Sequence, residues 1–151
     1  MNKQQLKLFQ VDETLSLCNG LPPRPSNGWL ATVREALGMT ASGAAARAGI
    51  TAGGWADAER REVSGGITLK TMSEMADVLG CKAELVLIPR RPLETVVLDR
   101  VREIAAAETE TGRKTMALEG QAPSAEHLAK RLKLREAELF GSDNWSSTLW
   151  R

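Results

Sequence analysis

Histidine, cysteine and aromatic residues are scarce in this chain of 151 residues. It contains one His, two Cys and no Tyr, and aromatic residues make up 4% of the total. Because His127, Cys18 and Cys81 lie far apart, neither a His/Cys zinc site nor a disulfide framework is expected. The cysteines are expected to be reduced, as in a cytoplasmic protein. No metal or other cofactor is expected.

Excess charge and long apolar runs are also missing. Lys and Arg number 20 against 19 Asp and Glu, which excludes a polybasic protein but not a local basic face. No stretch approaches the roughly 20 apolar residues of a membrane span, and the first residues lack the apolar core of a signal peptide. We therefore expect no contact with a membrane. Hydrophobic residues at 42% and charged residues at 26% are typical of a folded globular protein.

Proline-containing breaks divide the chain into an N-terminal arm, a central segment and a C-terminal segment: 1–27, 28–90 and 91–151. In the arm, apolar residues at helical spacing predict an amphipathic helix over 3–17, followed by a Pro-rich connector. The arm is expected to pack either on its own chain or on a partner subunit, and both alternatives are open.

The central segment predicts four short helices and then a strand. Ser26 or Asn27 is expected to cap the first helix, and Thr40 and Thr51 are expected to cap the next two. Residues 82–90, KAELVLIPR, alternate in the manner of a β-strand. A lone strand leaves its backbone groups unpaired. We therefore expect it to pair with the same strand of a second copy across a two-fold axis.

The C-terminal segment predicts a helix over 93–107, a break over 109–112 and a final helix that ends near Phe140. The residues after it are expected to be irregular. Trp145 and Trp150 are expected to dock on the body or on a partner, because such large apolar side chains seldom stay exposed without a function.

Four residues of the central segment form a recognisable pattern: Ala45, Gly49, Ile50 and Trp55. A small residue at Ala45 lets a second helix cross closely, Gly49 takes a left-handed turn, and Ile50 and Trp55 are expected to face the core. The pattern resembles the lambda-repressor-like (Xre/Cro) helix-turn-helix family, and residues 26–120 are similar to the bacterial family called mobile mystery protein A. The resemblance implies a mostly α fold. It would comprise a lambda-repressor-like helix-turn-helix domain, one C-terminal strand that pairs in a dimer, and a helical C-terminal extension.

The same resemblance implies a DNA-contacting surface. The second helix of the motif would enter the major groove with its N-terminal residues, and three arginines would contact phosphates. These candidate DNA-binding residues are Arg47, Thr51, Ala52, Gly53, Gly54, Asp57, Arg60 and Arg61. Ala and Gly have no side-chain donor or acceptor for a base edge, so residues 52–54 depart from the polar side chains usual in the family.

A second motif lies in the C-terminal segment, where Thr115, Glu119 and Gly120 match the pattern [S/T]-x-x-x-E-[G/N]. This pattern resembles the inhibitory helix of Fic-domain regulation; Fic enzymes transfer AMP from ATP to a target hydroxyl. In such systems the glutamate pairs with an arginine of the phosphate-binding loop and displaces the γ-phosphate of ATP. The alternative is an ordinary helix end, with Glu119 exposed and Gly120 as the C-terminal stop.

Together these patterns predict a regulator that is not an enzyme. We expect an antitoxin of a toxin–antitoxin module that inhibits a Fic-domain toxin through Glu119. We also expect it to bind operator DNA, as a homodimer through residues 82–90, and to repress its own operon. One alternative is a stand-alone helix-turn-helix transcriptional repressor without a toxin partner. Another is a protein-interaction module that no longer binds DNA.

Overall fold

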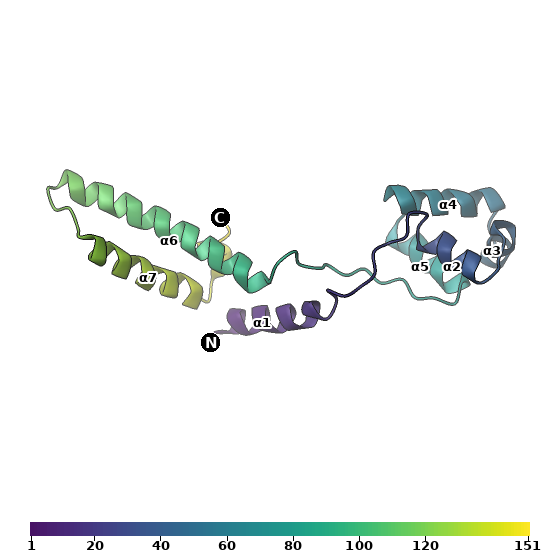
Figure 1. Cartoon of the computed structure of the whole chain (residues 1–151), viewed down its shortest axis with the longest axis horizontal. Coiled ribbons are helices and arrows are strands. Elements are labelled where there is room, and N and C mark those ends of the chain that lie inside the picture. Colours follow the sequence, from purple (N-terminus) through teal and green to yellow (C-terminus); the bar gives the residue numbers. More distant parts are fainter. The chain divides into compact units, whose positions relative to one another are not determined.

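Helices are the only regular secondary structure in a computed structural model that describes all residues from 1 to 151 (Figure 1). The eight helices are α1 (Lys3–Ser16), α2 (Trp29–Ala36), α3 (Ala41–Ala48), α4 (Ala52–Ser64), α5 (Leu69–Val78), α6 (Leu93–Leu118), α7 (Ala125–Gly141) and α8 (Trp145–Thr148). They form two compact units, one of residues 21–86 and one of residues 1–20 with 87–151. None of the helices combines the length and apolar character that a membrane crossing requires.

Helices α2 to α5 make up the unit of residues 21–86, and threonine hydroxyls cap three of them. Each hydroxyl accepts a hydrogen bond from the backbone N–H three residues further on: Thr40, Thr51 and Thr68. Gly49, at φ 68°, takes the left-handed turn between α3 and α4. The predicted caps at Thr40 and Thr51 and the predicted turn at Gly49 are confirmed.

Trp55 of α4 lies at the centre of this unit's core and is 0% exposed. The core consists of Leu30, Ala44, Ala45, Trp55, Ala58, Met75 and Leu79. The two alanines of α3 let α4 pack closely against it. The expectation that Ile50 also faces the core is wrong, because Ile50 is 44% exposed. It lies in the turn, where its side chain covers Gly54 at the start of α4.

The predicted strand over 82–90 is wrong. Residues 81–89 have no regular secondary structure, and no part of the chain forms a strand. The expected fold, a lambda-repressor-like domain with a C-terminal strand paired across a dimer, is therefore corrected to an all-helical one. The alternating pattern has no neighbouring strand to bond to, and Pro89 and Pro92 have no N–H to donate. Leu85 and Leu87 are exposed instead.

Helices α1, α6, α7 and α8 make up the other unit. Within it, α6 and α7 run side by side as an antiparallel hairpin, joined by residues 119–124 (Figure 1). The core lies at the base of the hairpin: Leu8, Val97, Val101, Ala105, Leu139, Trp145 and Leu149. No side chain between residues 106 and 138 is fully buried. The distal half of the hairpin therefore depends on partly exposed contacts.

Helix α1 is fastened to this unit at both ends. The Asn2 amide donates hydrogen bonds to two carbonyls at the end of α7 (2.9 and 3.0 Å). The Asp12 carboxylate accepts from the backbone N–H groups of Leu93 (2.7 Å) and Glu94 (2.8 Å) at the start of α6. A carboxylate is favoured there because the first N–H groups of a helix lack internal partners. Of the two alternatives for the N-terminal arm, α1 thus packs on its own chain.

Two expectations for the C-terminal segment are wrong. No break occurs over 109–112, because α6 runs through it and the Thr111 hydroxyl bonds to the helix's own Ala107 carbonyl (3.0 Å). The chain end is not wholly irregular, since α8 forms there and buries Trp145 in the core. The expected docking of Trp145 on the body is thus confirmed, whereas Trp150 remains 53% exposed.

Candidate functional site

The α6 tip, residues 115–120, is the turn in which α6 ends and the hairpin reverses. Glu119 is the C-cap, and its N–H bonds to the Thr115 carbonyl (3.3 Å). Gly120 has φ 74°, a left-handed conformation, and the N–H of the residue after it bonds to the Met116 carbonyl (2.9 Å). This is the terminal bond of a Schellman motif, which requires glycine or a similarly permissive residue at Gly120. The motif residues predicted from the sequence thus adjoin one another at an exposed helix end.

The Glu119 carboxylate points to solvent without a cationic partner from the chain. The arginines nearest in sequence and on the facing helix have other contacts: Arg113 pairs with Glu110 (2.7 Å), and Arg131 approaches the Met116 sulfur (3.6 Å). The carboxylate also lies at the C-terminal end of α6, where the helix dipole is negative. A cation supplied from outside would therefore be favoured at this position.

Two arginines of α7 brace the distal half of α6. Arg135 forms a two-pronged ion pair with the Glu108 carboxylate (2.5 and 3.2 Å). This pairing holds the pKa of Glu108 below its usual range and raises the pKa of Arg135, because the hydrogen bonds favour both charged forms. The Arg131 guanidinium lies over Gly112, where an added Cβ would be 3.6 Å from it. These contacts link α7 to the distal half of α6, where no side chain of the hairpin is fully buried.

The first turn of α4 forms the other candidate surface. Residues 51–53 are exposed and Gly54 is half-buried, whereas Trp55 points into the core. The Thr51 hydroxyl accepts from the Gly54 N–H (3.0 Å). Residues 52–54 have no side chain beyond a Cβ, so a partner could approach the backbone of this turn closely. The exposed first N–H groups of a helix favour anions such as phosphate.

The four charged residues predicted for DNA contact differ in their surroundings. Arg47 is exposed in the last turn of α3, and no carboxylate pairs with it. Arg60 and Arg61 both contact the Asp57 carboxylate, at 3.3 and 2.8 Å. Asp57 therefore neutralises part of the positive charge on the outer face of α4, and Arg47 is the arginine available to a phosphate.

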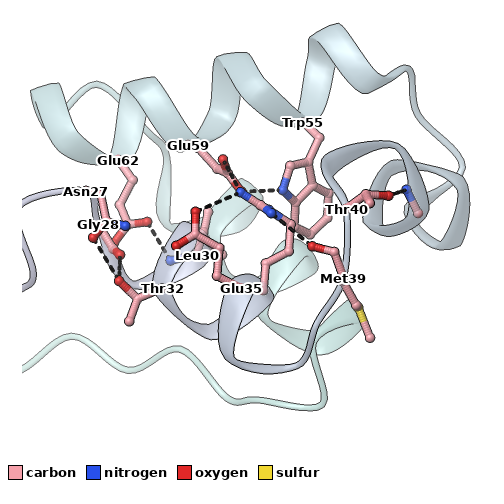
Figure 2. A network of polar contacts seen from close by, with 12 residues as sticks. Asn27, Gly28, Leu30, Thr32, Glu35, Met39, Thr40, Trp55, Glu59 and Glu62 are labelled. Atoms are coloured by element: carbon pink, nitrogen blue, oxygen red, sulfur yellow. Dashed lines mark hydrogen bonds and ion pairs between the residues drawn. The ribbon is translucent and has the colours of Figure 1, made fainter.

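A network of polar contacts that was not predicted from the sequence joins α2 to α4 (Figure 2). The Trp55 indole N–H donates to the Glu59 carboxylate (2.6 Å), which also accepts from the Arg34 guanidinium (2.6 and 3.2 Å). Arg34 donates further to the Met39 carbonyl (2.9 Å). The Glu59 hydrogen bond raises the pKa of Arg34. The i,i+4 spacing of Trp55 and Glu59 could have indicated part of this network.

A second missed contact fixes the start of α2. The buried Glu62 carboxylate of α4 accepts from the first two N–H groups of α2 (2.6 and 2.9 Å). Arg24 of the connector donates to two carbonyls at the end of α4 (2.6 and 3.0 Å). The caps expected from Ser26 or Asn27 are wrong, because Gly28 is the N-cap residue and the capping side chain comes from α4. These contacts hold α4, and with it the exposed first turn, against α2.

An apolar groove of about 660 Å³ lies in the same unit. Trp29 and Val33 of α2, Leu69 and Met72 of α5, and Leu85 of the irregular segment line it. No three His, Cys, Asp or Glu side chains are placed to hold a metal ion.

No protein-family model, curated protein or solved structure matches the chain.

Proposed function

We propose that the chain is the antitoxin of a toxin–antitoxin module and inhibits a Fic-domain AMP-transferase with Glu119. The observation that carries the proposal is the exposed, unpaired Glu119 carboxylate at the end of the α6–α7 hairpin. A helical hairpin with a free carboxylate at the end of its first helix has the shape and charge to enter an anion site. Thr115 lies one helical turn before Glu119, so its hydroxyl, which donates to the Thr111 carbonyl (3.2 Å), lies on the same side of α6.

The inhibition follows from competition for one anion position. AMP transfer requires the α-phosphate of ATP to lie in line with the target hydroxyl, and the γ-phosphate helps to set that alignment. An arginine of the enzyme would form a charge-assisted pair with Glu119 instead of with the γ-phosphate. ATP bound in the remaining space would then be misaligned, and transfer would stop.

The test measures AMP transfer by the product of the neighbouring gene, expected to carry a Fic domain, with labelled ATP and increasing amounts of the full chain. Wild type should suppress transfer. Glu119→Ala should need at least about 30-fold more protein for the same suppression, because it removes one partner of a buried charge pair.

Glu126→Ala is the matched control. Glu126 is also exposed on the hairpin, in the first turn of α7, and its loss changes the net charge equally. It should inhibit as wild type does. Full inhibition by Glu119→Ala, or a neighbouring product without a Fic domain, would refute the proposal.

A second role, autorepression through operator DNA, is supported by the exposed first turn of α4 and by Arg47. Backbone N–H groups and Arg47 would grip phosphates, which position a protein without specifying sequence. The absence of side chains at residues 52–54 means that any base readout would come from Thr51 and Asp57 or from DNA shape.

Gel shifts with the upstream DNA over a salt series test this role. Arg47→Ala should weaken binding and lower the salt slope by about one. Lys133→Ala, an exposed cation of α7, is the control and should leave binding unchanged. Equal affinity for random DNA would contradict operator recognition.

A homodimer through residues 82–90 would place two copies on such an operator. Leu85 and Leu87 are exposed in this irregular segment, and a contact between copies would bury them. Sizing chromatography of Leu87→Ser should then show a smaller species than wild type.

A stand-alone repressor without a toxin is the alternative, favoured if no Fic-domain protein co-purifies. The two free cysteines support a cytoplasmic location.

A further inference from the structure

Leu118, the last residue of α6, is 90% exposed, more than any other large apolar residue of the chain. It directly precedes Glu119. An apolar side chain in this position gains nothing from the core of its own unit. Solitary exposed apolar residues are common on protein surfaces, so its position beside Glu119 is what distinguishes it from the comparably exposed Leu17.

The helix end does not use Leu118. In the Schellman motif, the accompanying apolar contact involves the helical residue whose carbonyl accepts the terminal bond, and here that residue is Met116. Met116 is half-buried and touches Arg131 of α7. Leu118 lies away from this contact and is free for a partner.

Leu118 shares the outer face of the last turn with the two motif residues. It is three residues after Thr115, and Glu119 is four residues after Thr115, so all three project from neighbouring positions. All three are exposed. The tip therefore presents a hydroxyl, an apolar group and an unpaired carboxylate on one surface.

We propose that Leu118 is a second anchor of the α6 tip and fills an apolar pocket beside the cation that receives Glu119. The inference rests on the proposed function: the occupant is the nucleotide-site rim of the Fic-domain partner. Charge complementarity supports that partner surface, because Glu119 is exposed and no cation of the chain pairs with it. An exposed ion pair is weak in water, whereas an apolar side chain packed beside it excludes water and strengthens it. Leu118 thus determines how tightly, and to which partner, Glu119 binds.

Isothermal calorimetry of the full chain with the ATP-free Fic-domain protein tests the inference. Leu118→Ser should raise the Kd by about tenfold or more, the factor expected from burying a leucine side chain. Leu118→Met should stay within about threefold of wild type, since Met fills an apolar pocket of similar volume. Leu17→Ser is the matched control, because Leu17 is 83% exposed at the end of α1, and it should bind as wild type does. Circular dichroism should show unchanged helix content in all three variants.

The outcomes separate the inference from the proposed function. If Leu118→Ser binds as wild type does while Glu119→Ala loses inhibition, the inference is overturned and the proposed function stands. Equal weakening by Leu118→Ser and Leu118→Met also overturns it, since an apolar pocket would accept Met. If the wild-type chain neither binds nor inhibits the Fic-domain protein, both fail.

Discussion

Replacing Gly28 by alanine should destabilise the unit of residues 21–86 more than any other single methyl addition in it. Gly28, the N-cap of α2, has φ 84° and ψ 164°. This backbone region is essentially confined to glycine, and other residues pay of order 1–3 kcal/mol to occupy it. The strain alone would remove a large part of a typical domain's stability.

The added methyl would also meet the carboxylate that caps α2. A Cβ at Gly28 would lie 2.7 Å from the Glu62 Oε2 atom. Glu62 is buried and holds the first two N–H groups of α2, so it can retreat only by giving up these bonds. Hydrogen bonds to a charged group contribute about 1.5–3 kcal/mol. Adding the loss of one such bond to the strain gives about 2.5–6 kcal/mol for Gly28→Ala.

Gly38→Ala separates the two causes. Gly38 has φ 67°, and an added Cβ there would have no atom within 4 Å. It should cost only the left-handed strain of about 1–2 kcal/mol. Hydrogen exchange of the slowest amides in α4, followed by mass spectrometry, reports the free energy of opening of this unit without interference from the other unit. Equal losses for the two variants would refute the argument that Glu62 is locked in place.

Two further predictions concern the unit that carries the hairpin. Asp12→Ala should lower the free energy of unfolding of this unit by about 1 kcal/mol, because α6 loses its N-terminal cap. Urea unfolding checks this. Glu13→Ala is the control and should change little, because Glu13 is exposed. The lowered pKa of Glu108 means that its pair with Arg135 stabilises the fold above pH 4.5, the carboxyl's ordinary pKa, and is lost as pH falls through the lowered folded-state pKa. Because the pair is half exposed, its contribution is below about 1 kcal/mol. The drop in Tm between pH 7 and pH 2.5 should therefore be slightly larger for wild type than for Arg135→Met, and a larger drop in the variant would contradict this assignment.

Features set by near neighbours in the chain could be predicted from the sequence. A threonine before a helical run accepts the N–H three residues on whatever the rest of the chain does, and Thr40 and Thr51 do so. The turn at Gly49 could likewise be predicted, because the left-handed conformation between two short helices depends on the absence of a Cβ there. The helix at Lys3–Ser16 also follows its local apolar spacing.

Features set by residues distant in the chain could not be predicted from the sequence. The cap of α2 comes from Glu62, 32 residues further along the chain than Leu30, so local capping preferences pointed to the wrong side chains. The segment 82–90 alternates as a strand does, but alternation reports only which side chains are apolar. Whether a strand forms depends on a neighbour with free backbone groups, and this chain contains none.

The candidate site shows the same division. Sequence spacing was sufficient to place Thr115, Glu119 and Gly120 within one helical turn. The i,i+3 pair of Arg113 with Glu110 could also have been expected from spacing, but the contact of Arg131 with Met116 could not, because it depends on the packing of α7 against α6. Sequence spacing thus placed the motif residues but not the contact of Arg131 beside them.

The placement of Glu119 is unlike that of the carboxylates that hold this fold together. Asp12 and Glu62 lie at helix N-termini and accept backbone N–H groups, and Glu59 and Glu108 pair with arginines. In each case the negative charge is stabilised by positive charge or by the positive end of a helix. Glu119 lies at a helix C-terminus, where the dipole opposes it. Stability of the free chain therefore gives no reason for a carboxylate at this position, whereas a cationic site on a partner would.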